Sequence, residues 1–135
     1  MTAKRTGTKT AKVTLQKAFE AEQTRRDAER QERENAERRQ QEEDLARAEE
    51  LQALLAVDPE FLDAKGLTLD RRRYTVTLDH AEFRIAAYFE GGQAMVRSAD
   101  KRSTTGGVAP RKEQVVQTVE DAVMVMAQYL ADERI

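Results

Sequence analysis

The sequence has no cysteine and no tryptophan, and it contains only two prolines and one histidine in 135 residues. The absence of cysteine excludes disulfides, thiolate metal sites and cysteine nucleophiles, and it fits a reducing compartment. No run approaches the roughly 18 to 20 apolar residues that a membrane-spanning helix needs, and residues 1–12 lack the apolar core of a signal peptide. We therefore expect a soluble, cytoplasmic protein without a membrane partner.

Charged side chains dominate what is present. They make up 36% of the sequence, against a usual share of about a quarter, and the net charge is -2. A chain of this length and composition can bury one small core at most. Composition changes twice along the chain, which divides the sequence into residues 1–12, 13–57 and 58–135.

The first two segments are both highly charged but differ in kind. Residues 1–12 contain four basic residues and no acidic residue, so we expect a disordered basic tail. Residues 13–57 contain no glycine or proline and are rich in Glu, Arg, Gln and Ala, with acid-first pairs such as Glu22 and Arg26 one turn apart. This second segment predicts one long charged helix.

Larger apolar residues are confined to the two ends of this helix. Residues 20–44 contain no apolar side chain larger than alanine, which excludes a coiled-coil core there and predicts few tertiary contacts. Nearer the end of the helix, apolar residues recur at spacings of three and four: Leu45, Ala48, Leu51, Leu54 and Leu55. We expect this end to dock, and we take Leu45, Leu51 and Leu55 as partner-binding candidates.

The third segment opens with a helix boundary and continues with a sheet. Asp58 and Pro59 predict the start of a short helix, and Gly66 predicts its end. Phe61 and Leu62 are expected on the buried side of this helix. Polar and apolar residues then alternate, and the Gly91-Gly92 pair is a strong hairpin signal. The pattern predicts a three-stranded antiparallel meander with strands at residues 74–79, 83–90 and 93–99.

A polar loop at residues 100–110 leads to a predicted final helix at residues 111–133. Apolar residues recur there at helical spacing: Val115, Val119, Ala122, Val123, Met126, Ala127 and Leu130. The predicted fold is therefore α+β, with a long charged N-terminal helix and a small α-β-β-β-α domain. In that domain we expect the C-terminal helix to pack on the meander and to contact residues 45–55.

Few residues suggest catalysis. The single histidine, His80, stands close to Asp79 and Glu82 at a predicted turn, where a surface role is favoured over acid–base chemistry. One imidazole without thiolates offers no recognisable metal site. Because the sequence also lacks a nucleophile–base pair and a cofactor motif, we predict a protein that is not an enzyme and needs no metal or cofactor.

Basic residues offer an alternative function, a nucleic-acid contact made through phosphates. The candidates are Arg71, Arg72, Arg73, Lys101, Arg102, Arg111 and Lys112. The last four flank a loop with two glycines and several hydroxyl groups, and such loops attract phosphate. Residues 58–135 nevertheless contain 11 basic and 13 acidic residues, whereas nucleic-acid-binding domains are usually basic. Nucleic acid is therefore a possible partner that we do not favour.

The leading hypothesis is a non-enzymatic protein-interaction or scaffold protein. Tyr88 faces the polar side of its strand beside Ala86, where the two form an apolar patch that a partner could cover. A three-stranded sheet with one helix has a thin core and leaves apolar surface on that helix, so a homodimer is expected. On this interpretation the C-terminal domain dimerises or docks on a protein partner, and the charged helical arm reaches another.

Overall fold

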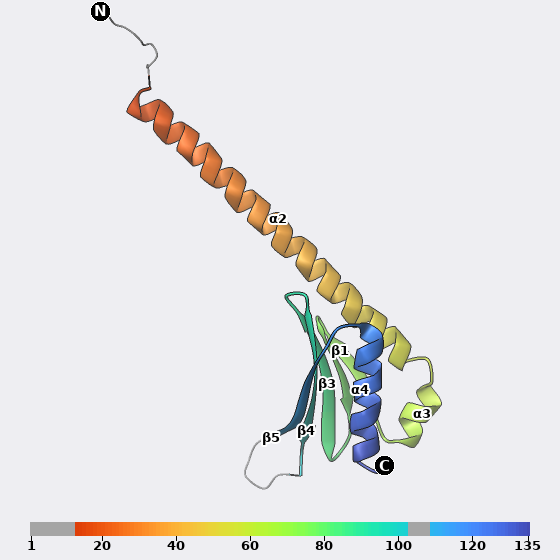
Figure 1. Ribbon diagram of the computed structural model, residues 1–135. Coiled ribbons are helices and arrows are strands. Elements are labelled where there is room, and N and C mark those ends of the chain that lie inside the picture. Colours follow the sequence, from red (N-terminus) through yellow and green to blue (C-terminus); the bar gives the residue numbers. More distant parts are fainter. Residues whose placement is uncertain (1–12, 103–108) are drawn as a thin grey trace, which may run out of the picture. The chain divides into compact units, whose positions relative to one another are not determined.

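The computed structural model describes residues 13–102 and 109–135, so the predicted basic tail lies outside the described residues (Figure 1). The chain divides into two units, residues 1–38 and residues 39–135. The long helix α2 (Leu15–Leu55) runs through the boundary between them, and its last turns belong to the second unit.

Helix α2 confirms the predicted long helix. The hydroxyl of Thr14 accepts a hydrogen bond from the N–H of Lys17 at 3.1 Å, which satisfies one main-chain donor in the first turn. Glu22 forms ion pairs with Arg25 and, at 2.9 Å, with Arg26. No side chain from residue 15 to residue 43 is buried. Among the described residues, no helix combines the length and the apolar character needed to cross a membrane.

The sheet has five antiparallel strands in sequential order, where the sequence predicted three. The strands are β1 (Thr68–Arg72), β2 (Thr75–Asp79), β3 (Phe83–Glu90), β4 (Gln93–Asp100) and β5 (Ala109–Val116). Strands β2, β3 and β4 are the predicted meander. The two edge strands were missed, because both carry charged residues instead of a clear alternation.

Strand β5 also corrects the predicted start of the final helix. Residues 109–116 pair with β4, where Glu113 lies opposite Arg97. The helix α4 (Val119–Asp132) begins only after Thr118, whose hydroxyl accepts from the N–H of Asp121 at 3.0 Å. The prediction of helix from residue 111 was therefore wrong for its first eight positions, because Thr118 supplies the helix cap and the preceding residues complete the sheet.

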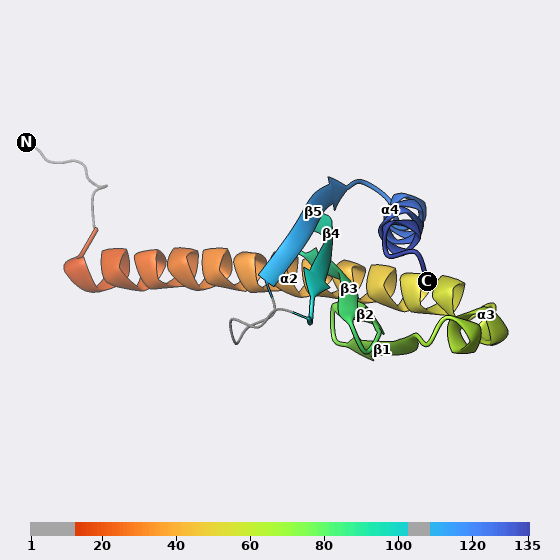
Figure 2. The same ribbon diagram turned by 90° about the horizontal axis from the view of Figure 1, so that it is seen from below.

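The core lies on one face of the sheet, which we call the inner face. Helix α4 packs there against β3, β4 and β5, and Figure 2 shows it to one side of the strands. The buried apolar residues of the two helices are Ala48 and Leu51 from α2, and Val119, Ala122, Val125, Met126 and Tyr129 from α4. The buried face of α4 is therefore rotated relative to the apolar stripe that the sequence predicted, because the helix also packs against the fifth strand.

A short connection joins α2 to the sheet as the sequence predicted. The side chain of Asp58 accepts from the N–H of Phe61 at 3.1 Å and caps α3 (Pro59–Ala64). Gly66 follows with a φ of +70°, a conformation that glycine adopts without strain. Helix α3 therefore packs beside β1, close to the inner face.

Candidate functional site

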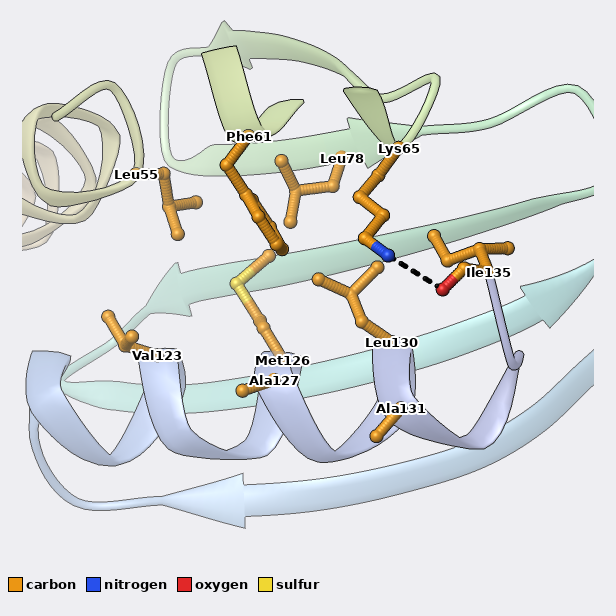
Figure 3. Close-up of a pocket in the computed structure, with 10 residues that line it drawn as sticks. All are labelled: Leu55, Phe61, Lys65, Leu78, Val123, Met126, Ala127, Leu130, Ala131 and Ile135. Carbon is orange, nitrogen blue, oxygen red and sulfur yellow. Dashed lines mark hydrogen bonds between the residues drawn. The ribbon is translucent and has the colours of Figure 1, made fainter. Parts of the chain in front are cut away.

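The second unit carries an apolar groove of about 330 Å³ between α3 and α4, which we call the α3–α4 groove (Figure 3). Its lining comes from the end of α2, from α3, from β2 and from α4. The lining residues are Leu55, Phe61, Lys65, Leu78, Val123, Met126, Ala127, Leu130, Ala131 and Ile135. A volume of this size lies at the lower end of the range for ligand pockets and admits a few side chains.

Local structure explains how the apolar side chains of the groove are presented. The Asp58 cap fixes the start of α3, and the neighbouring residue Leu62 anchors this helix in the core. Phe61 then extends towards Met126 on the facing helix, and it remains 43% exposed (Figure 3). The sequence predicted Phe61 as a buried residue, so this position is a correction. The half-exposed ring stays available for contact.

The electrostatics of the groove are simple. Among the described lining residues, Lys65 carries the only ionisable side chain, and its Nζ donates to the main-chain oxygen of Ile135 at 2.9 Å. The two helices that form the walls, α3 and α4, together contain five acidic residues and no basic residue. None of these five acidic residues lines the groove, so the lining is apolar apart from Lys65.

The four residues predicted to bind a partner are not brought together. Leu55 lines the groove, whereas Leu51 is fully buried in the core and Leu45 is half-buried. Tyr88 lies on the opposite, outer face of the sheet, with the guanidinium of Arg97 5.3 Å from its ring centroid. The groove was missed because its aromatic residue and its α4 residues meet only after folding.

The seven basic residues of the nucleic-acid hypothesis do not form one surface. Arg71, Arg72 and Arg73 lie where β1 turns into β2. Strand register places Lys101 and Arg102 beyond the opposite end of the sheet, because Asp100 pairs with the first residue of β3. The glycines of the loop between them and β5 lie outside the described residues.

Acidic side chains also pair with most of these basic residues. Arg71 donates to the side chain of Gln52 at 2.7 Å and lies 3.9 Å from Glu49. The other pairs are Arg72 with Asp70, Lys101 with Asp79, Arg102 with Asp100 and with Glu133, and Lys112 with Asp132. Arg73 adopts a left-handed φ of +54°, and Arg111 contributes its backbone to β5. Local pairing therefore reduces the positive potential that phosphate would meet.

His80 forms part of the turn between β2 and β3. Its ring stacks on that of Phe83 with centroids 4.5 Å apart, and its Nδ1 accepts from the N–H of Glu82 at 3.0 Å. Among residues 13–102 and 109–135, no group of three or more His, Cys, Asp or Glu side chains is placed to hold a metal ion. These contacts give the histidine a structural part in the turn.

The Asp79 carboxylate supports a prediction about acid stability. Partial burial alone would raise its pKa, but hydrogen bonds from Lys101 at 3.0 Å and Arg84 at 3.1 Å lower the pKa below the ordinary value of 3.8. A lowered folded-state pKa stabilises the fold above the unfolded-state value, and this contribution is lost as the pH falls through the folded-state value. Wild type should therefore exceed Asp79→Asn in stability at pH 6, and the difference should shrink below about pH 4.

Thermal unfolding at a series of pH values measures this difference. Asp63→Asn, which changes an exposed carboxylate on α3, is the matched control. A gap between wild type and Asp79→Asn that stays constant down to pH 2.5 would contradict the assignment of the two hydrogen bonds.

No protein-family model, curated protein or solved structure matches this chain. A function must therefore be argued from the chemistry of its own surfaces. The α3–α4 groove, with its apolar lining, is the candidate functional site.

Proposed function

We propose that this protein is a non-enzymatic interaction or scaffold protein that docks a protein partner in the α3–α4 groove of its C-terminal unit. The observation that carries the proposal is an apolar groove on the surface of a chain in which 36% of the residues are charged. Exposed apolar concavities of this kind mark interaction sites. Apart from Lys65 the described lining has no ionisable side chain, which favours binding over catalysis.

The groove also indicates the chemistry of its partner. An apolar groove between two helices suits an amphipathic helix, which inserts side chains spaced three or four residues apart. The net negative charge of α3 and α4 favours basic residues beside that apolar stripe. We therefore propose a basic amphipathic helix as the occupant, with α2 residues 15–38 serving as a charged spacer towards a second partner.

A matched pair of variants tests the groove. Phe61→Ala removes a ring that is 43% exposed and lines the groove, whereas Leu54→Ala removes a side chain that is 42% exposed and does not. Peptides selected against the wild-type chain from a display library of basic amphipathic helices provide the probe. Phe61→Ala should weaken their binding at least about tenfold, measured by fluorescence anisotropy, because burial of an aromatic ring is lost.

The Leu54→Ala variant is the control for this binding measurement. Leu54→Ala should leave the affinity within about twofold of wild type, since the change lies outside the groove. Failure to select any peptide, or equal effects of the two variants, would refute docking in the groove. The alternative function would instead be supported if the purified protein carried a nucleic acid that nuclease removes. Its binding to that nucleic acid should then weaken steeply as the salt concentration rises.

A further inference from the structure

The two edges of the sheet are protected differently. Strand β1 is short, carries Asp70, Arg71 and Arg72, and has α3 packed beside it. Charges and covering elements are the usual means of keeping a sheet edge from pairing with another chain. Strand β5 is longer, and its last three residues together with the next residue read Gln-Val-Val-Gln at residues 114–117, without a charge. The end of β5 therefore lacks that protection.

Apolar side chains flank this edge on both faces of the sheet. On the outer face Val115 is 56% exposed and lines a small hollow with Tyr88 and Met95. On the inner side Met124 of α4 is 61% exposed, beside a second hollow of about 290 Å³. That hollow is lined by Gln114, Val115, Val116, Gln117, Asp121, Met124, Val125 and Gln128, of which one residue is charged. Depletion of charge with exposed methionine is typical of the centre of a protein interface.

We propose that β5 pairs with β5 of a second copy of this chain, antiparallel and about a two-fold axis at Gln114. The five strands of each copy then form one continuous sheet across the dimer. This inference goes beyond the proposed function, because β5 and the α3–α4 groove are separate surfaces. Both α4 helices lie on the same face of the joined sheet, since a two-fold axis perpendicular to a sheet preserves its faces.

Charge along β5 selects the register. Directly opposite residues of an antiparallel pair share a face, so a two-fold axis places one residue opposite its own copy. An axis at Arg111, Lys112 or Glu113 would set like charges against each other, which is unfavourable. The first position without this conflict is Gln114, and it retains a ladder over residues 112–116.

The Gln114 register also preserves the ion pairs already present. Glu113 faces Val115 of the other copy and can keep its hydrogen bond from Arg97 at 2.8 Å. Lys112 faces Val116 and can keep its pair with Asp132. The two copies of Val115 become diagonal neighbours on the outer face, where each covers apolar surface of the other. An isolated peptide strand could form the main-chain hydrogen bonds of the β5 edge. It would not bring a second set of the apolar side chains that flank this edge, such as Val115, so we assign a second copy of the chain as the occupant.

Cysteine cross-linking tests the register directly, because the chain has no cysteine of its own. Opposite residues of an antiparallel pair have Cα atoms about 4.5–5.5 Å apart, within the range of a disulfide. Full-length Gln114→Cys should form a covalent dimer under mild oxidation. Thr68→Cys, an exposed position on the β1 edge, should not. Equal cross-linking of both variants would overturn the assignment of the edge.

Charge substitution at the same position gives an independent test. Gln114→Lys and Gln114→Glu should each weaken the dimer at least tenfold, and an equimolar mixture should restore a heterodimer, measured by light scattering coupled to size exclusion. A monomeric wild-type mass at tens of micromolar, or a dimer insensitive to both substitutions, would overturn the proposal. Phe61→Ala should leave the mass unchanged, so failure of the groove and failure of the dimer are distinguished.

Discussion

Replacing Asp44 with alanine is expected to lower the free energy of unfolding of the second unit by about 2–4 kcal/mol. The side chain is only 3% exposed, although it belongs to the most charged part of the sequence. Its Oδ2 accepts from the N–H of Gly91 at 2.9 Å, and its Oδ1 accepts from the N–H of Gly92 at 3.2 Å. Alanine would leave both main-chain donors without this partner in a largely dehydrated site.

The effect is large because Asp44 joins two elements far apart in sequence. Gly91 and Gly92 have φ values of +60° and +83°, as the tight turn between β3 and β4 requires. Gln40 donates to Asp44 at 3.1 Å, and Arg47 donates to the carbonyl oxygen of Gly92 at 3.2 Å. The turn is therefore held by one face of α2, and loss of the carboxylate should loosen residues 39–55 from the sheet.

Two further variants make the measurement specific. Glu43→Ala changes an exposed carboxylate on the same helix and should alter stability by less than about 0.5 kcal/mol. Asp44→Asn keeps one acceptor oxygen, so its loss of stability should lie between the losses for Asp44→Ala and Glu43→Ala. Urea unfolding followed by circular dichroism measures all three, and equal destabilisation by Asp44→Ala and Glu43→Ala would contradict the proposed role of the carboxylate.

The sequence could not single out Asp44. It lies in a run of charged residues that predicts a solvated helix, and nothing local distinguishes it from Glu43. Its partners stand 47 and 48 residues away. The turn itself was predictable from the glycine pair alone, because the required positive φ is a local property. The contact that fixes α2 on the turn is a property of the folded chain.

The same distinction between local and tertiary signals explains the strands. In β3 every second residue faces the core, so its apolar alternation is visible in the sequence and its predicted bounds are confirmed. Each edge strand pairs on one side only; β1 was taken as a connection and most of β5 as the start of the final helix. In β5 an Arg-Lys-Glu run looked like the first turn of a helix, because pairing of Glu113 with Arg97 across the sheet cannot be read locally.

The α3–α4 groove shows a related limit. The sequence located the start of α3 correctly and predicted Leu55, which lines the groove, as a docking residue, but it assigned Phe61 to the core. One apolar face on a six-residue helix can be buried only in part, and Leu62 occupies the inward position. Which residues remain accessible depends on the facing helix, whose orientation is set by the unpredicted fifth strand.

That orientation leads to the second large effect, which is expected when the buried methionine of α4, and not the exposed one, is replaced by aspartate. Met126 is 1% exposed and Met124 is 61% exposed, although they stand two residues apart on the same helix. Met126→Asp would bury a charge without a partner and should unfold the second unit, at a cost of more than about 4 kcal/mol. Met124→Asp should change the stability of the monomer by less than about 1 kcal/mol.

Comparing Met124→Asp with Met126→Asp isolates the effect of burial. Both variants exchange the same two residue types at helix interior positions, so the change in helix propensity is equal and cancels in the comparison. Thermal unfolding followed by circular dichroism at about 1 µM, a concentration chosen to limit self-association, measures the monomer. Val123→Asp should give an intermediate loss, because Val123 is half-buried at the groove. A larger loss for Met124→Asp than for Met126→Asp would mean that α4 presents its other face to the sheet, and both the groove and the β5 interface would then be wrong.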